Sequence, residues 1–288
     1  RMALDNRGEI DVRLGSLVLA GGGTSSGQYL LTEGVSLSFT GGDTVLTETS
    51  GIRGEGSVSF IGGTTQIGGA YDIGGLTSIS GGRVGFNGDR TIAEIVLSGG
   101  TLEGSGVMEI GDRLSWSGGT MGGTGETRVS SGGLLILEGG RKELQRRLVT
   151  AGQSEWRAGN IRFANGTFVN AVGGEMDVTL AGNLEWNGGV NRFINEGVFR
   201  KLGEGQLEVN TRVGFDNHGE IDVRLGSLVL AGGGTSSGQY LIAEGVGLSF
   251  TGGDRVLTES SGIRGEGSVN FIGGTTQIGG AYDIGGLT

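Results

Sequence analysis

The chain has 288 residues, of which 67 are glycine, and it contains neither proline nor cysteine. Its formal charge of −10 argues against a nucleic-acid-binding protein, because such proteins present a basic face. The lack of cysteine excludes a disulfide framework. No apolar stretch approaches the roughly 20 residues of a membrane span, so we do not expect membrane insertion.

The sequence repeats itself over a long distance. Residues 5–77 return as residues 216–288 at an offset of 211, and only seven of these 73 positions differ. Repetition at a fixed period is typical of array proteins. We therefore interpret 5–215 as one long sequence unit and 216–288 as the start of a second, within one continuous solenoid over 1–288.

A shorter motif recurs along the first part of the chain: an apolar residue, a spacer and two glycines. Successive motifs are 20, 21, 19, 18, 19 and 21 residues apart, and their apolar residues are Leu19, Phe39, Phe60, Ile79, Leu97, Trp116 and Leu137. After Trp156 a Phe-x-Asn-x-Gly motif follows, at 193–197 and 215–219.

The segments between the glycines predict strands. Residues 16–19, 35–39 and 57–61 alternate apolar with small or polar side chains, which is the period of a half-buried strand. Glycine pairs supply the positive-φ corners. Short strands and coils of about 20 residues predict an all-β parallel β-solenoid, or β-helix, stacked into a rod. A β-propeller is the competing fold, but the uneven spacing and the lack of a blade motif disfavour it.

The missing proline supports the solenoid, because each stacked coil must donate its N–H groups to a neighbour. We expect apolar ladders inside the coils, with Trp116 and Trp156 filling the same slot. Asn195 and Asn217 predict an asparagine ladder with amides hydrogen-bonded along the axis. The predicted ladder residues are Phe39, Phe60, Trp116, Trp156, Asn195 and Asn217.

The segment 141–149 departs from the glycine rhythm and predicts either two helical turns or a bulged strand. Six basic and two acidic residues lie between Arg141 and Arg162. One interpretation is a solvated coil edge. The other is a positive patch that contacts the acidic face of another copy, or an anionic polysaccharide. The candidate contact residues are Arg141, Lys142, Arg146, Arg147, Arg157 and Arg162.

No catalytic, cofactor or metal site is expected. The single histidine, His218, is replaced by Arg7 in the other copy, and arginine cannot act as a general base. Carboxylates that recur in both copies are scattered at corners, namely Asp43, Glu48, Glu55 and Asp72. No phosphate-binding loop and no nonapeptide calcium series is present.

The Gly-Gly-Thr coils at 62–64, 99–101 and 118–120, with the Phe-x-Asn-x-Gly coils, resemble glycine-rich repeats of large bacterial secreted β-solenoid adhesins. These are of the filamentous-haemagglutinin and autotransporter-passenger kind. The resemblance implies a secreted or cell-surface fibre or adhesin shaft without catalysis, which contacts copies of itself end to end or laterally. The alternatives are a carbohydrate-binding adhesin, which an exposed row of tyrosines would favour, and a polysaccharide-degrading β-helix.

Overall fold

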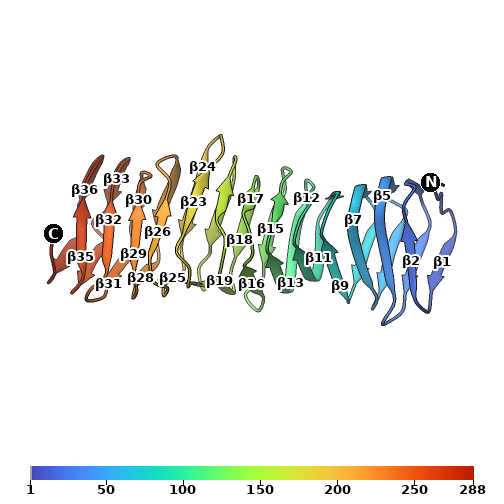
Figure 1. The fold of residues 1–288 in the computed structure, drawn as a ribbon, viewed down its shortest axis with the longest axis horizontal. Coiled ribbons are helices and arrows are strands. Elements are labelled where there is room, and N and C mark those ends of the chain that lie inside the picture. Colours follow the sequence, from blue (N-terminus) through green and yellow to red (C-terminus); the bar gives the residue numbers. More distant parts are fainter. Residues whose placement is uncertain (1) are drawn as a thin grey trace. The chain divides into compact units, whose positions relative to one another are not determined.

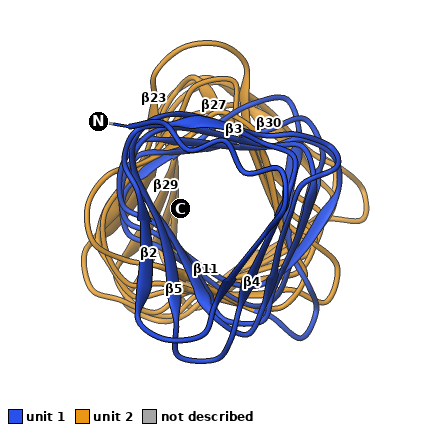
Figure 2. Cartoon of the chain, turned by 90° about the vertical axis from the view of Figure 1, so that its right-hand side faces the viewer, with its two compact units in different colours: residues 1–133 blue, residues 134–288 orange. Residues whose placement is uncertain are grey.

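The computed structural model describes residues 2–288 and confirms the predicted fold class. These residues form 37 short strands and no helix, in parallel coils of about 21 residues that make a β-solenoid of about 13 turns (Figure 1). Since no helix is present over this range, none is long and apolar enough to cross a membrane. The chain divides into two compact units, residues 1–133 and 134–288 (Figure 2).

Unit 1 carries the first fifteen strands. They are β1 (Glu9–Val12), β2 (Ser16–Leu19), β3 (Gly23–Ser25), β4 (Gln28–Leu31), β5 (Ser36–Leu46), β6 (Gly51–Gly54), β7 (Ser57–Ile67), β8 (Ala70–Ile73), β9 (Leu76–Ile79), β10 (Arg83–Phe86), β11 (Arg90–Leu97), β12 (Thr101–Glu103), β13 (Val107–Trp116), β14 (Gly119–Met121) and β15 (Glu126–Val129).

Unit 2 carries the remaining strands. They are β16 (Leu134–Leu137), β17 (Lys142–Leu144), β18 (Arg147–Thr150), β19 (Gln153–Trp156), β20 (Ile161–Phe163), β21 (Thr167–Asn170), β22 (Glu175–Val178), β23 (Gly182–Trp186), β24 (Asn191–Asn195), β25 (Val198–Lys201), β26 (Gln206–Val209), β27 (Val213–Asn217), β28 (Glu220–Val223), β29 (Ser227–Leu230), β30 (Gly234–Ser236), β31 (Gln239–Ile242), β32 (Gly247–Phe250), β33 (Asp254–Leu257), β34 (Gly262–Gly265), β35 (Ser268–Phe271), β36 (Thr275–Ile278) and β37 (Ala281–Ile284).

Each strand pairs in parallel with the strand one coil away, so equivalent residues stand in columns. In unit 1 one column that runs through β2, β5, β7, β9, β11 and β13 is buried and contains Leu19, Phe39, Phe60, Ile79, Leu97 and Trp116. The rings of Phe39 and Phe60 stack with centroids 5.2 Å apart. These contacts confirm the apolar ladder predicted at Phe39, Phe60 and Trp116.

Unit 2 has a matching arrangement of buried columns. Trp156, at the end of β19, pairs with Leu137 before it and Val178 after it, and is fully buried. Its indole Nε1 donates to the carbonyl of Gly159 at 2.8 Å, so the polar edge of the ring is satisfied. The column continues through Lys201 to Val223.

The corners depend on glycine, as predicted. In six of the seven Gly-Gly motifs the second glycine has a positive φ, and in the seventh it is the first, Gly139. At Gly63, with φ of 75°, a Cβ atom would collide with the backbone of Gly41 and Gly42 one coil away. Both the conformation and the close approach of neighbouring coils therefore require glycine there.

The segment 141–149 is extended rather than helical. It contributes β17 and the start of β18, whose residues pair in register with β20 and β21. The alternative of two helical turns is therefore wrong, because the parallel ladder of the adjoining coils continues through this segment.

Candidate functional site

The structure corrects the prediction of a basic contact patch. Lys142 and Arg146 are buried, with 0% and 4% of their surfaces exposed, so neither is available to a partner. Lys142 stands in an inward column, in register with Ile161 on β20. The alternation of β17 directs it inside, which the glycine-free composition of the segment did not reveal.

Three of the other candidate residues face solvent but are paired with carboxylates. Arg141 Nε lies 3.2 Å from Glu185 Oε2, Arg162 pairs with Glu143 one coil away, and Arg157 pairs with Glu155 on its own strand. Arg147 is also exposed, and it likewise interacts with another residue rather than standing free. Each of the first three arginines therefore has a carboxylate partner. Glu143 and Glu155 belong to the segment itself, and only Glu185, on β23, comes from outside it.

The buried lysines are held by main-chain carbonyls. Lys142 Nζ donates to the carbonyl oxygens of Glu138, Gly140 and Ala158 at 2.8, 2.8 and 2.9 Å. Burial lowers the Lys142 pKa to about 8, and the nearby Glu138 carboxylate opposes this shift. Lys201 donates to the carbonyl of Gly203, and burial lowers its pKa as well. Both lysines lie inside the coils and hydrogen-bond the main chain of the corners from within.

The asparagine ladder is present and longer than predicted. Asn170 Nδ2 donates to Asn195 Oδ1 at 2.8 Å, and Asn195 Nδ2 donates to Asn217 Oδ1 at 2.9 Å. All three side chains are fully buried. Asn195 Nδ2 also reaches the carbonyl of Glu220 at 2.9 Å, so the ladder ties side chains and backbone of successive coils together.

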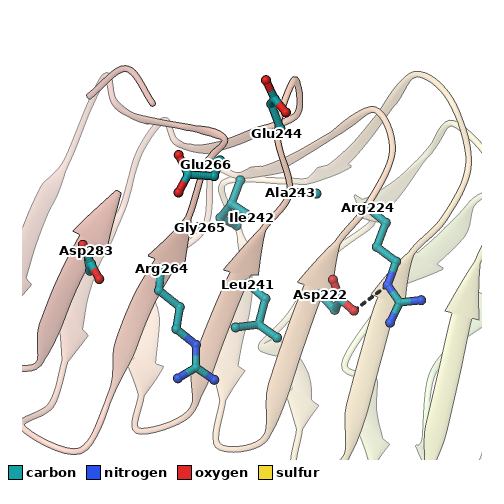
Figure 3. A pocket seen from close by; sticks show the side chains of 10 residues that line it. All are labelled: Asp222, Arg224, Leu241, Ile242, Ala243, Glu244, Arg264, Gly265, Glu266 and Asp283. Atoms are coloured by element: carbon teal, nitrogen blue, oxygen red, sulfur yellow. Dashed lines mark hydrogen bonds and ion pairs between the residues drawn. The ribbon is translucent and has the colours of Figure 1, made fainter. Parts of the chain in front are cut away.

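Unit 2 has an open hollow of about 670 Å³ on its surface, which we call the β31 hollow (Figure 3). Its floor is Leu241, Ile242, Ala243 and Gly265. Charged residues form the rim, namely Asp222, Arg224, Glu244, Arg264, Glu266 and Asp283.

Strand register places these residues side by side. Asp222, Leu241, Arg264 and Asp283 occupy one outward column on β28, β31, β34 and β37. Gly265 has φ of 132° and adds no side chain between the corners that carry Ala243 and Glu266. The absence of a side chain there leaves the floor of the hollow open.

The charges of the rim are only partly paired. Arg224 Nε lies 2.6 Å from Asp222 Oδ2. Across residues 2–288, no ion pair joins Glu244, Glu266, Arg264 or Asp283 to another residue. Figure 3 shows the Glu244 and Glu266 carboxylates on the corner side of the hollow, with the Arg264 guanidinium directed away from them.

Unit 1 contains a smaller, related hollow at the repeated residues. It measures about 460 Å³ and is lined by seven of the residues 211 positions earlier, namely Asp11, Arg13, Leu30, Leu31, Thr32, Arg53 and Gly54. The equivalents of Glu244, Glu266 and Asp283 do not line it. Arg13 again pairs with Asp11, at 2.6 Å. Thr32 replaces Ala243, and its hydroxyl donates to the carbonyls of Val12 and Arg13.

The sequence interpretation did not identify this hollow. Asp72 and Glu55 were noted only as scattered corner carboxylates. Coil register would have indicated which charged residues stand next to one another. For example, Arg53 and Asp72 are 19 residues apart, about one coil, and they are paired on the adjacent strands β6 and β8. The 211-residue repeat then places Arg264 and Asp283 in the same relation.

Other candidate residues lie apart from the hollow. Tyr29, Tyr71 and Tyr240 are buried and hydrogen-bonded through their hydroxyls to Ser25, Thr77 and Ser236, so they do not form an exposed row. His218 Nδ1 lies 2.8 Å from Ser237 Oγ at an exposed corner. Within residues 2–288, no cluster of three or more histidine or carboxylate side chains has metal-binding geometry.

Comparisons with protein-family profiles, with curated proteins and with solved structures give no match for this chain.

Proposed function

We propose that this chain is a structural β-solenoid module of a secreted or cell-surface fibre, such as the shaft of a bacterial adhesin. Its mechanism is the stacking of coils through backbone ladders, apolar columns and the asparagine ladder. It has no catalytic role in this proposal, and its principal partners are copies of itself.

The observation that supports this proposal is that the repeated sequence rebuilds the same strands. β1 to β4 of unit 1 correspond, 211 positions later, to β28 to β31 of unit 2, each over equivalent residues. The pairing of Glu9 with Gln28 in unit 1 is matched by the pairing of Glu220 with Gln239 in unit 2. Further along, β5 and β7 each correspond to two shorter strands in the second copy, β32 with β33 and β35 with β36. A unit that forms nearly the same coils when repeated can lengthen a fibre with little change of its surface.

The resemblance to glycine-rich bacterial adhesin repeats supports the extracellular location. The buried tyrosines remove the main feature that favoured a carbohydrate-binding adhesin, an exposed aromatic row.

Electron microscopy of the native material, with power spectra along any filament, tests the proposal. We expect a meridional spacing of about 4.8 Å from stacked strands. Surface labelling of intact cells with an antibody against residues 5–77 should be positive and should be lost after external protease treatment. Isolated particles without the spacing, or labelling only after cell lysis, would contradict the proposed role.

A further inference from the structure

We propose that the β31 hollow is a docking site for a basic, extended peptide segment, which places a lysine or arginine side chain across its floor. The inference concerns this surface alone and is independent of the proposed fibre role.

The shape and chemistry of the floor suit the stem of such a side chain. Leu241 and Ala243 provide an apolar surface next to carboxylates at the corners, and Ile242 lies buried beneath it. Lysine and arginine pack their methylene stems along apolar surfaces while the charged head remains at a polar edge. The volume, about 670 Å³, lies within the range of ligand-binding clefts, which is roughly 300–1,000 Å³.

The charges of the rim favour a cationic occupant. The rim holds four carboxylates and two arginines, and Arg224 is already neutralised by Asp222. Glu244 and Glu266 lie on one side without an ion-pair partner, and Arg264 points away from them (Figure 3). The net charge of the whole chain, −10, also attracts a basic partner.

The fold leaves room for the Glu266 side chain. Its carboxylate lies against Gly285, where a Cβ atom would collide with it, and Glu55 has the same relation to Gly74 in unit 1. In both copies of the repeated sequence, a glycine of the next coil thus leaves space for this glutamate side chain.

A second copy of the chain is a poor occupant. It carries the same charge of −10, and its basic segment has two buried residues, Lys142 and Arg146, and three arginines that are paired with carboxylates, Arg141, Arg157 and Arg162. A neutral saccharide is disfavoured because the hollow has no aromatic side chain in its lining.

The test measures binding of fluorescein-labelled hexalysine to the full chain by anisotropy at 150 mM salt. We expect the Glu244→Gln/Glu266→Gln variant to bind hexalysine about tenfold more weakly, because it removes both carboxylates that have no ion-pair partner and could contact a lysine ammonium group. The control is Glu204→Gln/Glu259→Gln, which removes the same charge at exposed positions outside the hollow and should change affinity less than about twofold.

A third variant tests the floor without changing charge. Ala243→Thr introduces the residue that unit 1 carries at this position, so the fold accommodates it, and we expect roughly threefold weaker binding. Equal weakening by the hollow and control pairs would overturn the proposal, since it would show general attraction to an acidic protein. A second result would also overturn the proposal. In it, no variant changes hexalysine binding, but neutral cellohexaose binds saturably and Ala243→Thr weakens that binding. The hollow would then be assigned to a saccharide.

Discussion

At the scale of single residues, the least expected feature is charge inside the coils. Lys142 and Lys201 stand in columns otherwise built from residues such as Ile161 and Val223. A buried ammonium group is costly unless it is hydrogen-bonded, and main-chain carbonyls at the corners supply the acceptors. Sequence patterning alone assigns lysine to the surface, so these positions could not be predicted without strand register.

The buried Lys142 makes stability depend on pH in the alkaline range. Its pKa is about 8 in the folded chain and near 10.5 when unfolded, so between these values the unfolded state binds more protons. The free energy of unfolding should therefore rise with pH from about 8 towards 10, by at most about 3 kcal/mol. Buried Tyr71 and Tyr240, whose pKa values burial raises, reverse the trend at higher pH.

Urea midpoints measured from pH 7 to pH 10 check this expectation. In Lys142→Met the rise should shrink, and the remainder should reflect Lys201, whose pKa is lowered in the same direction. A rise of the same size in Lys142→Met would show that another group is responsible.

At the scale of strands and corners, the glycine pairs determine where each coil turns. The motif predicted the corner positions well, because a positive φ and close backbone contact both exclude side chains. The break at 141–149 was harder to predict. A short run without glycine has no distinct period, and only pairing with β20 and β21 shows that it is extended.

Replacing Gly63 with alanine should destabilise the protein by about 3 kcal/mol or more, because its φ is positive and the added Cβ meets the backbone of Gly42. Gly111→Ala is the matched control. It lies in β13 with open space around the added Cβ, and should change stability by less than about 0.5 kcal/mol. Thermal unfolding followed by circular dichroism compares the two, and equal losses would argue against a special role for the corner.

At the scale of the whole molecule, the sequence predicted the fold class but not the surface. Repetition, alternation and the lack of proline are properties of every coil, so they remain visible without a structure. The β31 hollow depends on which outward residues stand on adjacent strands, and coil lengths that vary from 18 to 21 residues leave that register undefined. The burial of Lys142 and Arg146 depends on strand register in the same way, so the composition of the basic segment did not reveal it.

The pairing of the exposed arginines and the net charge of the chain predict weak interaction with polyanions. The intact chain should not be retained on heparin at 150 mM salt, because Arg141 and Arg162 are already paired and the chain carries net negative charge. Arg141→Gln/Arg157→Gln should elute at the same salt concentration as the original protein. Retention that this variant abolishes would restore the polyanion hypothesis for the basic segment.

The near-identity of 5–77 and 216–288 also has a consequence for how the chain folds. Two segments that differ at seven positions can compete for the same place beside a growing coil, and the error would be an exchanged segment rather than an unfolded one. Arg255 is a buried difference between the two copies. It donates to the carbonyls of Phe215 and Gly232, and Thr44 stands at its position in the other copy. An exchange of segments would put Thr44 in its place and leave these two carbonyls without the donors that Arg255 supplies, so the exchanged form would differ from the correct one by a buried charge and its hydrogen bonds.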